Sequence, residues 1–79
     1  MTPEERQQMI RGMVEGLSQR LATEGGTAQE WARLIGAYGV LGETGKARQI
    51  WAEARETFAG RAQALEVLRA AAARAGVAE

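Results

Sequence analysis

The sequence predicts an all-α fold of about four helices in which consecutive helices run antiparallel. Apolar residues recur three or four positions apart along most of the 79 residues, which is the period of a helix. Glycines separate the periodic stretches, and the connections between them are short. Short connections favour antiparallel packing of neighbouring helices, so we expect helical hairpins rather than a sheet.

The first predicted helix covers residues 3–24. Thr2 is a good N-cap, Pro3 suits the first helical position, and Glu5 completes a capping box with Thr2. Gly25 ends the helix, because glycine accepts the left-handed backbone that stops one. The apolar stripe of this helix consists of Met9, Ile10, Met13, Val14, Leu17 and Leu21.

Two glycines, Gly12 and Gly16, flank this stripe four residues apart. Each costs about 1 kcal/mol relative to alanine in a helix interior, so a reason for their presence is expected. We favour a close crossing with another helix over a role in binding a ligand.

The second predicted helix covers residues 28–41. Thr27 and Glu30 form a second capping box at its start. Gly42 is the expected stop, because glycine is the usual residue just after a helix.

The third predicted helix begins at Thr44 or Gly45 and runs to Phe58, and Gly60 breaks the pattern after it. The fourth covers residues 61–75 and includes a run of alanines with high helix propensity.

The second and third helices share a spaced pattern of large and small residues. Large residues recur at i, i+3 and i+7 in the second helix, and a tryptophan lies between two alanines in the third. The alanines let the two helices approach closely, and the aromatic rings fill the space between them. The pattern resembles a tetratricopeptide repeat, a hairpin that stacks on its neighbours and presents a groove. Its members are Trp31, Leu34, Tyr38, Gly42, Ala47, Trp51 and Ala54.

This repeat covers residues 28–60 and occurs once in clear form. We expect residues 1–79 to form a single tetratricopeptide-like domain, with flanking helices over 3–24 and 61–75. The fourth helix echoes the start of a second copy, and the first takes the place of a preceding repeat's second helix. The predicted core between the helices consists of Trp31, Leu34, Tyr38, Leu41, Ile50 and Trp51, and we favour core packing over ligand stacking for both tryptophans.

Small residues form a second strip on the second helix, away from the face of Trp31. Ala32, Gly36 and Gly39 lie three or four residues apart. The first helix of each pair lines the concave face of a tetratricopeptide array, and a glycine strip there lets a ligand helix approach closely. Contact with the first helix through its own glycines is an equal alternative. The predicted peptide-binding groove comprises Gln29, Ala32, Arg33, Gly36, Gly39 and Val40.

Composition excludes several function classes. The formal net charge is zero, with no basic stripe, which argues against a nucleic-acid partner. The sequence has neither Cys nor His, so we expect no catalytic residue, no metal site and no cofactor site. Charges interrupt every apolar run, so we expect no direct membrane insertion by this chain. An arginine clamp for acidic peptides is less favoured than a solvated surface, its candidates being Arg33, Arg48, Arg55, Arg61 and Arg69.

Three segments are similar to the C-terminal periplasmic portion of the c-type cytochrome biogenesis protein family CcmI (CycH). They read MIRGMVEGL over residues 9–17, WARLI over 31–35 and YGVLG over 38–42. The resemblance covers most of the chain. Ile35 departs from the repeat pattern, which has a small residue there, and Ala59 and Gly60 replace its usual closing proline.

The resemblance implies a non-catalytic holdase for apocytochrome c. It implies binding of the C-terminal helix of apocytochrome c and delivery to the haem-ligation machinery. It also implies a periplasmic location, tethered to the inner membrane through a segment absent from this chain. Two other readings remain: a tetratricopeptide scaffold for another protein client, and a terminal cap or oligomerisation module.

Overall fold

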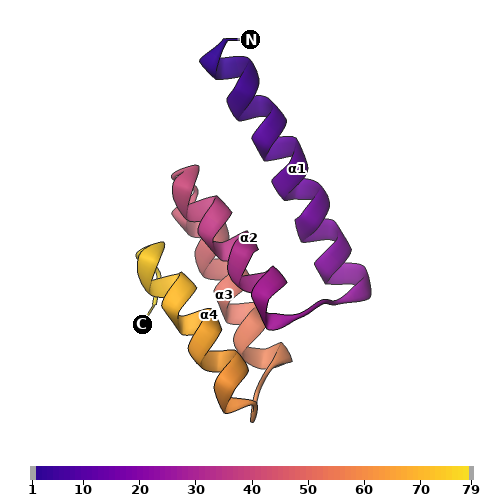
Figure 1. Ribbon diagram of the computed structural model, residues 1–79, viewed down its shortest axis with the longest axis vertical. Coiled ribbons are helices and arrows are strands. Elements are labelled where there is room, and N and C mark those ends of the chain that lie inside the picture. The colour runs from indigo at the N-terminus through magenta and orange to yellow at the C-terminus, as the bar shows by residue number, and fades with distance from the viewer. Residues whose placement is uncertain (1, 79) are drawn as a thin grey trace.

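The computed structural model describes residues 2–78, which form four helices and no strand. The helices are α1 (Pro3–Glu24), α2 (Ala28–Val40), α3 (Thr44–Thr57) and α4 (Ala62–Arg74). Consecutive helices run in opposite directions, as Figure 1 shows. The predicted all-α, tetratricopeptide-like fold is confirmed, and each predicted helix end lies within one residue of the observed one.

Both predicted capping boxes are present. The Thr2 hydroxyl accepts a hydrogen bond from the Glu5 N–H at 3.1 Å, and the Glu5 carboxylate accepts one from the Thr2 N–H at 3.0 Å. Thr27 and Glu30 repeat the arrangement at 3.2 and 3.0 Å. Each box satisfies two backbone N–H groups that the helix itself leaves without acceptors, so local chemistry fixes both helix starts.

Glycine in the left-handed region ends α2 and α4. Gly42 has φ 76°, and the next residue, Glu43, donates its N–H to the Tyr38 carbonyl at 2.9 Å. Gly76 has φ 78°, and Val77 donates to the Ala72 carbonyl at 2.8 Å. These Schellman turns let the chain reverse sharply after each helix.

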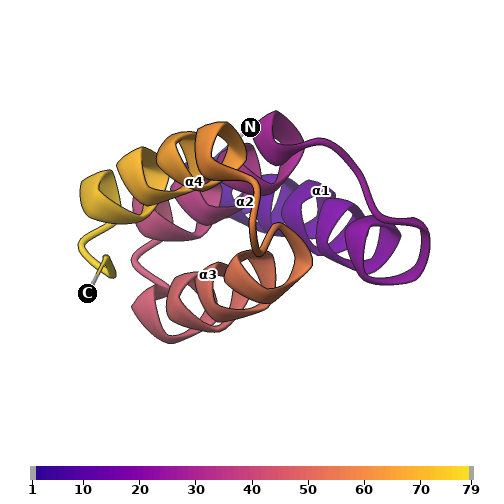
Figure 2. The ribbon, with the colours of Figure 1, turned by 90° about the horizontal axis from the view of Figure 1, so that it is seen from below.

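The core lies between α2, α3 and α4, with α2 at its centre. Helix α2 contacts all three other helices, and α4 lies beside both α2 and α3, as seen from below in Figure 2. The predicted core is confirmed, although Leu41 is only half-buried. Ile35 is fully buried, so the position that departs from the repeat pattern also serves the core. The buried members of the predicted core are Trp31, Leu34, Tyr38, Ile50 and Trp51.

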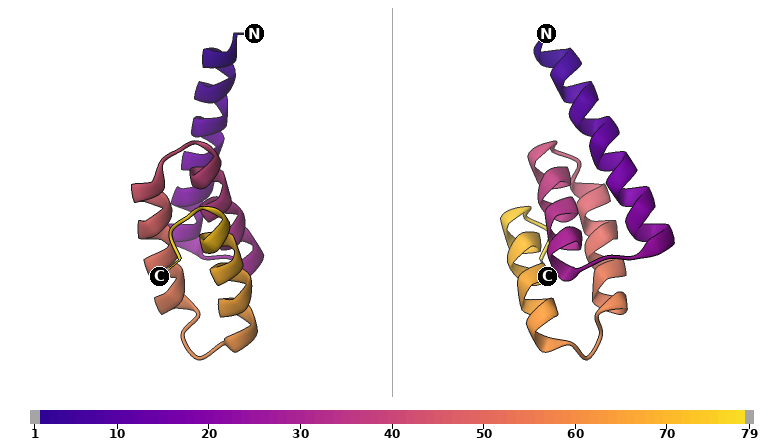
Figure 3. Two further views of the ribbon diagram at one scale, coloured as in Figure 1. Left: turned by 90° about the vertical axis from the view of Figure 1, so that its left-hand side faces the viewer. Right: turned by 45° about the vertical axis from the view of Figure 1, so that its right-hand side comes forward.

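Helix α1 packs on α2 through its second half only. Its first half extends beyond the other three helices, as Figures 1 and 3 show, and the molecule measures 44 × 26 × 17 Å. Val14 and Leu21 are buried, whereas Met9, Ile10 and Met13 are exposed. The apolar stripe of α1 is therefore divided into a packed half and an unpartnered half.

The predicted close crossing at Gly12 and Gly16 is wrong. A Cβ built on either glycine meets no atom within 4 Å, and both residues are exposed. Both lie on α1 away from the line of Val14 and Leu21 that contacts the bundle. Ion pairs reinforce that contact: the Lys46 ammonium lies 3.0 Å from the Glu15 carboxylate.

Candidate peptide-binding groove

A groove between α2 and α4 contains all six residues of the predicted peptide site. Its volume is about 550 Å³. The α2 wall is formed by the predicted residues, and the α4 wall by Ala71, Arg74 and Ala75. The structure thus brings the predicted residues together on one concave surface, whereas peptide binding there stays a prediction. The α2 residues are Gln29, Ala32, Arg33, Gly36, Gly39 and Val40.

Gly36 keeps the floor of this groove open. A Cβ built on Gly36 meets nothing within 4 Å, so no neighbouring helix occupies the space above it. Ala32 lies one turn earlier and is also small. Val40 marks one end of the groove and is 89% exposed, which is unusual for a branched apolar side chain. The groove therefore offers apolar surface that a second polypeptide can cover.

Gly39 has a different role from Gly36. A Cβ built on Gly39 would lie 2.8 Å from the Cβ of Ala75 and 3.0 Å from its Cα. Glycine here permits the close approach of α2 and α4 where α4 ends. The alternative that the small strip of α2 contacts the first helix is wrong for Gly39, because its close neighbour is Ala75, the residue that caps the end of α4.

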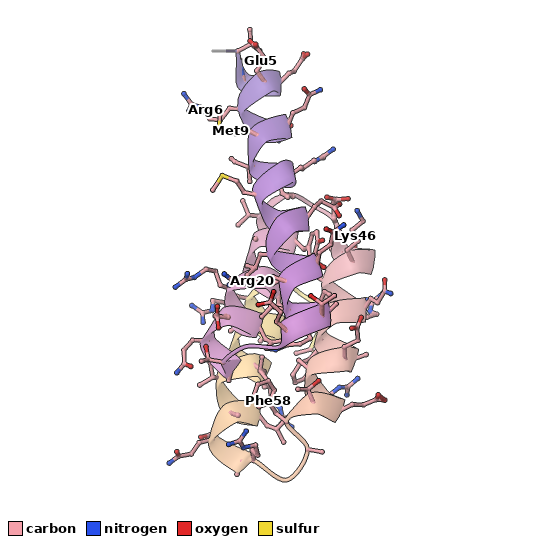
Figure 4. The ribbon with its side chains drawn as sticks, turned by 90° about the vertical axis from the view of Figure 1, so that its right-hand side faces the viewer. Glu5, Arg6, Met9, Arg20, Lys46 and Phe58 are labelled. Atoms are coloured by element: carbon pink, nitrogen blue, oxygen red, sulfur yellow. The ribbon has the colours of Figure 1, made fainter. Side chains whose placement is uncertain are left out.

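A second hollow continues the groove past Gln29, which lines both. This hollow has a volume of about 800 Å³ and lies between the start of α2 and the start of α4. Phe58, Arg61 and Val67 contribute to its lining, and Figure 4 labels Phe58 at the end of α3.

Sequence reasoning missed the α4 wall. The available signal was the similarity of the fourth predicted helix to the start of a second repeat. The first helix of that copy would line the same concave face as α2.

The groove carries positive charge although the chain is neutral overall. Arg33 and Arg74 lie on its opposite walls, and no carboxylate contributes to its lining. The ion pairs of residues 2–78 lie elsewhere. Three of them join α1 to Glu30, Glu43 or Lys46, and the fourth joins Glu43 to Lys46 at the start of α3. Figure 4 shows Lys46 on the side of α1 opposite to Met9 and Arg6.

Glu30 on α2 and Lys46 on α3 have shifted pKa values. The Thr27 backbone N–H donates to the Glu30 carboxylate and is the main reason that the pKa of Glu30 lies below its usual value. The Glu15 carboxylate accepts a hydrogen bond from Lys46 and raises the pKa of that ammonium. Both groups are therefore charged at neutral pH and hold α1 against α2 and α3 through surface ion pairs.

The groove lining consists of apolar surface, one amide and guanidinium groups. Within residues 2–78, no cluster of three or more His, Cys, Asp or Glu residues is placed to hold a metal ion. Over the same residues, no helix has both the length and the apolar character needed to cross a bilayer.

Comparison with known proteins relates this chain to one family. The chain is 39% identical over 59 residues to CycH, a cytochrome c-type biogenesis protein of Bradyrhizobium diazoefficiens. This confirms the resemblance to the CcmI (CycH) family. The matched segment is 75% of this chain but only 16% of the CycH relative. No family model and no solved structure matches, so the single repeat and the one-domain organisation stay predictions.

Proposed function

We propose that this chain is a peptide-binding module that acts in c-type cytochrome maturation and holds polypeptide without catalysing a reaction. The observation that carries the proposal is the open groove between α2 and α4, which is floored by Gly36 and combines small and apolar residues with Gln29, Arg33 and Arg74. The similarity to CycH, a cytochrome c-type biogenesis protein, supports the maturation context.

The client that we propose is the C-terminal helix of apocytochrome c. A helix with its side chains is about 10–12 Å across and can lay an apolar face into a groove between two helices. At Gly36 its side chains can reach the α2 backbone, and the exposed Val40 offers an apolar contact at the end of the groove. The holding step would precede transfer of the client to the haem-ligation machinery in the periplasm.

A calorimetric titration with a peptide of that C-terminal helix tests the proposal. Gly36→Leu should remove binding by filling the groove, while the protein stays folded because leucine is a better helix former than glycine. Gly12→Leu is the matched control, because Gly12 is also helical and open but lies on α1. Unchanged binding by a folded Gly36→Leu protein, or equal loss in both variants, would remove the groove as the site.

The exposed half of α1 favours a second candidate function, an oligomerisation module. Met9, Ile10 and Met13 are 49%, 40% and 69% exposed and occupy neighbouring positions i, i+1 and i+4 on α1. Sedimentation over a range of protein concentrations tests this role. A concentration-dependent mass that Met13→Gln lowers would support it, and a constant monomer mass would exclude it.

A further inference from the structure

The two hollows between α2 and α4 form one path along the length of these helices. They share Gln29 and are otherwise lined by different residues of α2 and α4. Val67 lies in one hollow and Val40 in the other, so apolar contacts are available in both. A helix of 13 residues such as α2 is about 20 Å long, so the path accommodates several turns of a ligand helix.

Three arginines and no carboxylate line this path. Arg61 contributes to one hollow, and Arg33 and Arg74 contribute to opposite walls of the other. The whole chain has ten basic and ten acidic residues, so this bias is local rather than a consequence of composition. None of the three guanidinium groups forms an ion pair with another of residues 2–78.

The charge of Arg33 acts on the Glu30 carboxylate, but both oxygens of that carboxylate already accept hydrogen bonds from other groups. One oxygen accepts a hydrogen bond from Arg20 at 2.6 Å, and the other accepts one from the Thr27 N–H at 3.0 Å. Arg33 acts on Glu30 only through its charge, without a contact. The guanidinium of Arg33 is therefore available to a carboxylate from outside the chain.

We infer that the α2–α4 groove selects a helical segment that has carboxylates on its flanks and an apolar ridge between them. This rests on the proposed function and names the class of client that the groove prefers. The ridge faces the open floor at Gly36, and the flanking Glu or Asp side chains face Arg33 on one wall and Arg74 on the other. Guanidinium groups bind carboxylates in a bidentate geometry, so the two walls also fix how the helix is rotated in the groove.

Two synthetic helical peptides with the same apolar ridge test this inference, one with Glu and one with Lys on its flanks. The full 79-residue chain is titrated with each by fluorescence anisotropy at low and at high salt. We expect the Glu peptide to bind about tenfold tighter at low salt, because two exposed ion pairs each contribute about threefold. High salt should reduce this preference.

Arg33→Gln and Arg74→Gln should each weaken binding of the Glu peptide about threefold, and neither should weaken binding of the Lys peptide. Arg48→Gln is the matched control, since Arg48 is exposed on α3 and lines neither hollow. If both peptides bind equally and Gly36→Leu still removes binding, the charge preference is overturned but the groove remains the binding site. If neither peptide binds, the proposed function is overturned as well. Displacement of the Glu peptide by a DNA oligonucleotide would overturn the choice of a polypeptide client.

Discussion

Gly39 of α2 lies directly against Ala75 at the end of α4, with only 2.8 Å between the Ala75 Cβ and the place that a Cβ on residue 39 would take. The Ala75 backbone is held in turn, because its N–H donates to the Ala71 carbonyl at 3.0 Å. Movement of Ala75 would therefore disturb the end of α4. This contact sets how closely the two groove walls approach.

Alanine substitutions at Gly39 and Gly36 should therefore change stability in opposite directions. Gly39→Ala should lower the free energy of unfolding by about 1–3 kcal/mol, because the new methyl group overpacks the contact with Ala75. Gly36→Ala should raise it by up to about 1 kcal/mol, because its methyl group enters open space and alanine favours the helix. Urea denaturation followed by circular dichroism measures both. A stabilised Gly39→Ala protein would show that α2 and α4 are less closely packed.

Trp31 should be essential to the core. It is only 4% exposed, and its replacement by alanine should cost about 3–5 kcal/mol. A chain of 79 residues has a total stability of about 4–12 kcal/mol, so the variant should lose at least about a quarter of it. Val40→Ala is the control, since Val40 is 89% exposed and should change stability by less than about 0.5 kcal/mol.

Fluorescence checks the Trp31 variant independently. Both indoles are buried, so the parent should emit to the blue of free tryptophan, and unfolding of Trp31→Ala should move the emission of Trp51 to the red. Parent-like melting and emission in Trp31→Ala would contradict a core role.

The two halves of α1 should respond differently to substitution. Leu21 is 2% exposed in the packed half, and Leu21→Ala should cost about 2–5 kcal/mol. Met13 is 69% exposed in the projecting half, and Met13→Gln should change stability by less than about 0.5 kcal/mol. Thermal unfolding of both variants measures the difference. A large cost of Met13→Gln in a monomeric sample would show that the first half of α1 packs on the molecule.

The helix boundaries could be predicted from sequence because local chemistry fixes them. Thr2 with Glu5, and Thr27 with Glu30, cap their helices through groups three residues apart, and Gly42 ends α2 through its own backbone conformation. No information from distant parts of the chain is needed for these contacts.

Contacts between helices could be predicted only in part. The spacing of the α2 residues placed them on one face, and the structure shows that face as a groove wall. The same kind of spacing at Gly12 and Gly16 suggested a helix crossing that does not exist. A small-residue pattern shows where another backbone can approach, but the partner is decided by distant residues. Ala75 supplies that partner for Gly39, and no residue among 2–78 supplies one for Gly12.

Acid should destabilise the protein through its capping boxes. Backbone hydrogen bonds from Thr2 and Thr27 hold the pKa values of Glu5 and Glu30 below the ordinary value of 4.5. In the unfolded chain the same carboxyls take up protons near that ordinary value. Their contribution to stability is therefore fully present above pH 4.5 and is lost as the pH falls through the lowered values of the folded state.

Glu30→Gln should flatten this dependence. Glutamine can still accept the Thr27 hydrogen bond in a capping box, but it has no charge to lose and cannot pair ionically with Arg20. The variant should be slightly less stable than the parent at neutral pH and should lose less stability below about pH 4.5. Urea midpoints measured between about pH 3 and 7 give the two profiles. Glu53→Gln is the control, because Glu53 is exposed on α3 outside either capping box, and its profile should follow that of the parent. A Glu30→Gln profile as steep as the parent's would show that the acid sensitivity arises elsewhere.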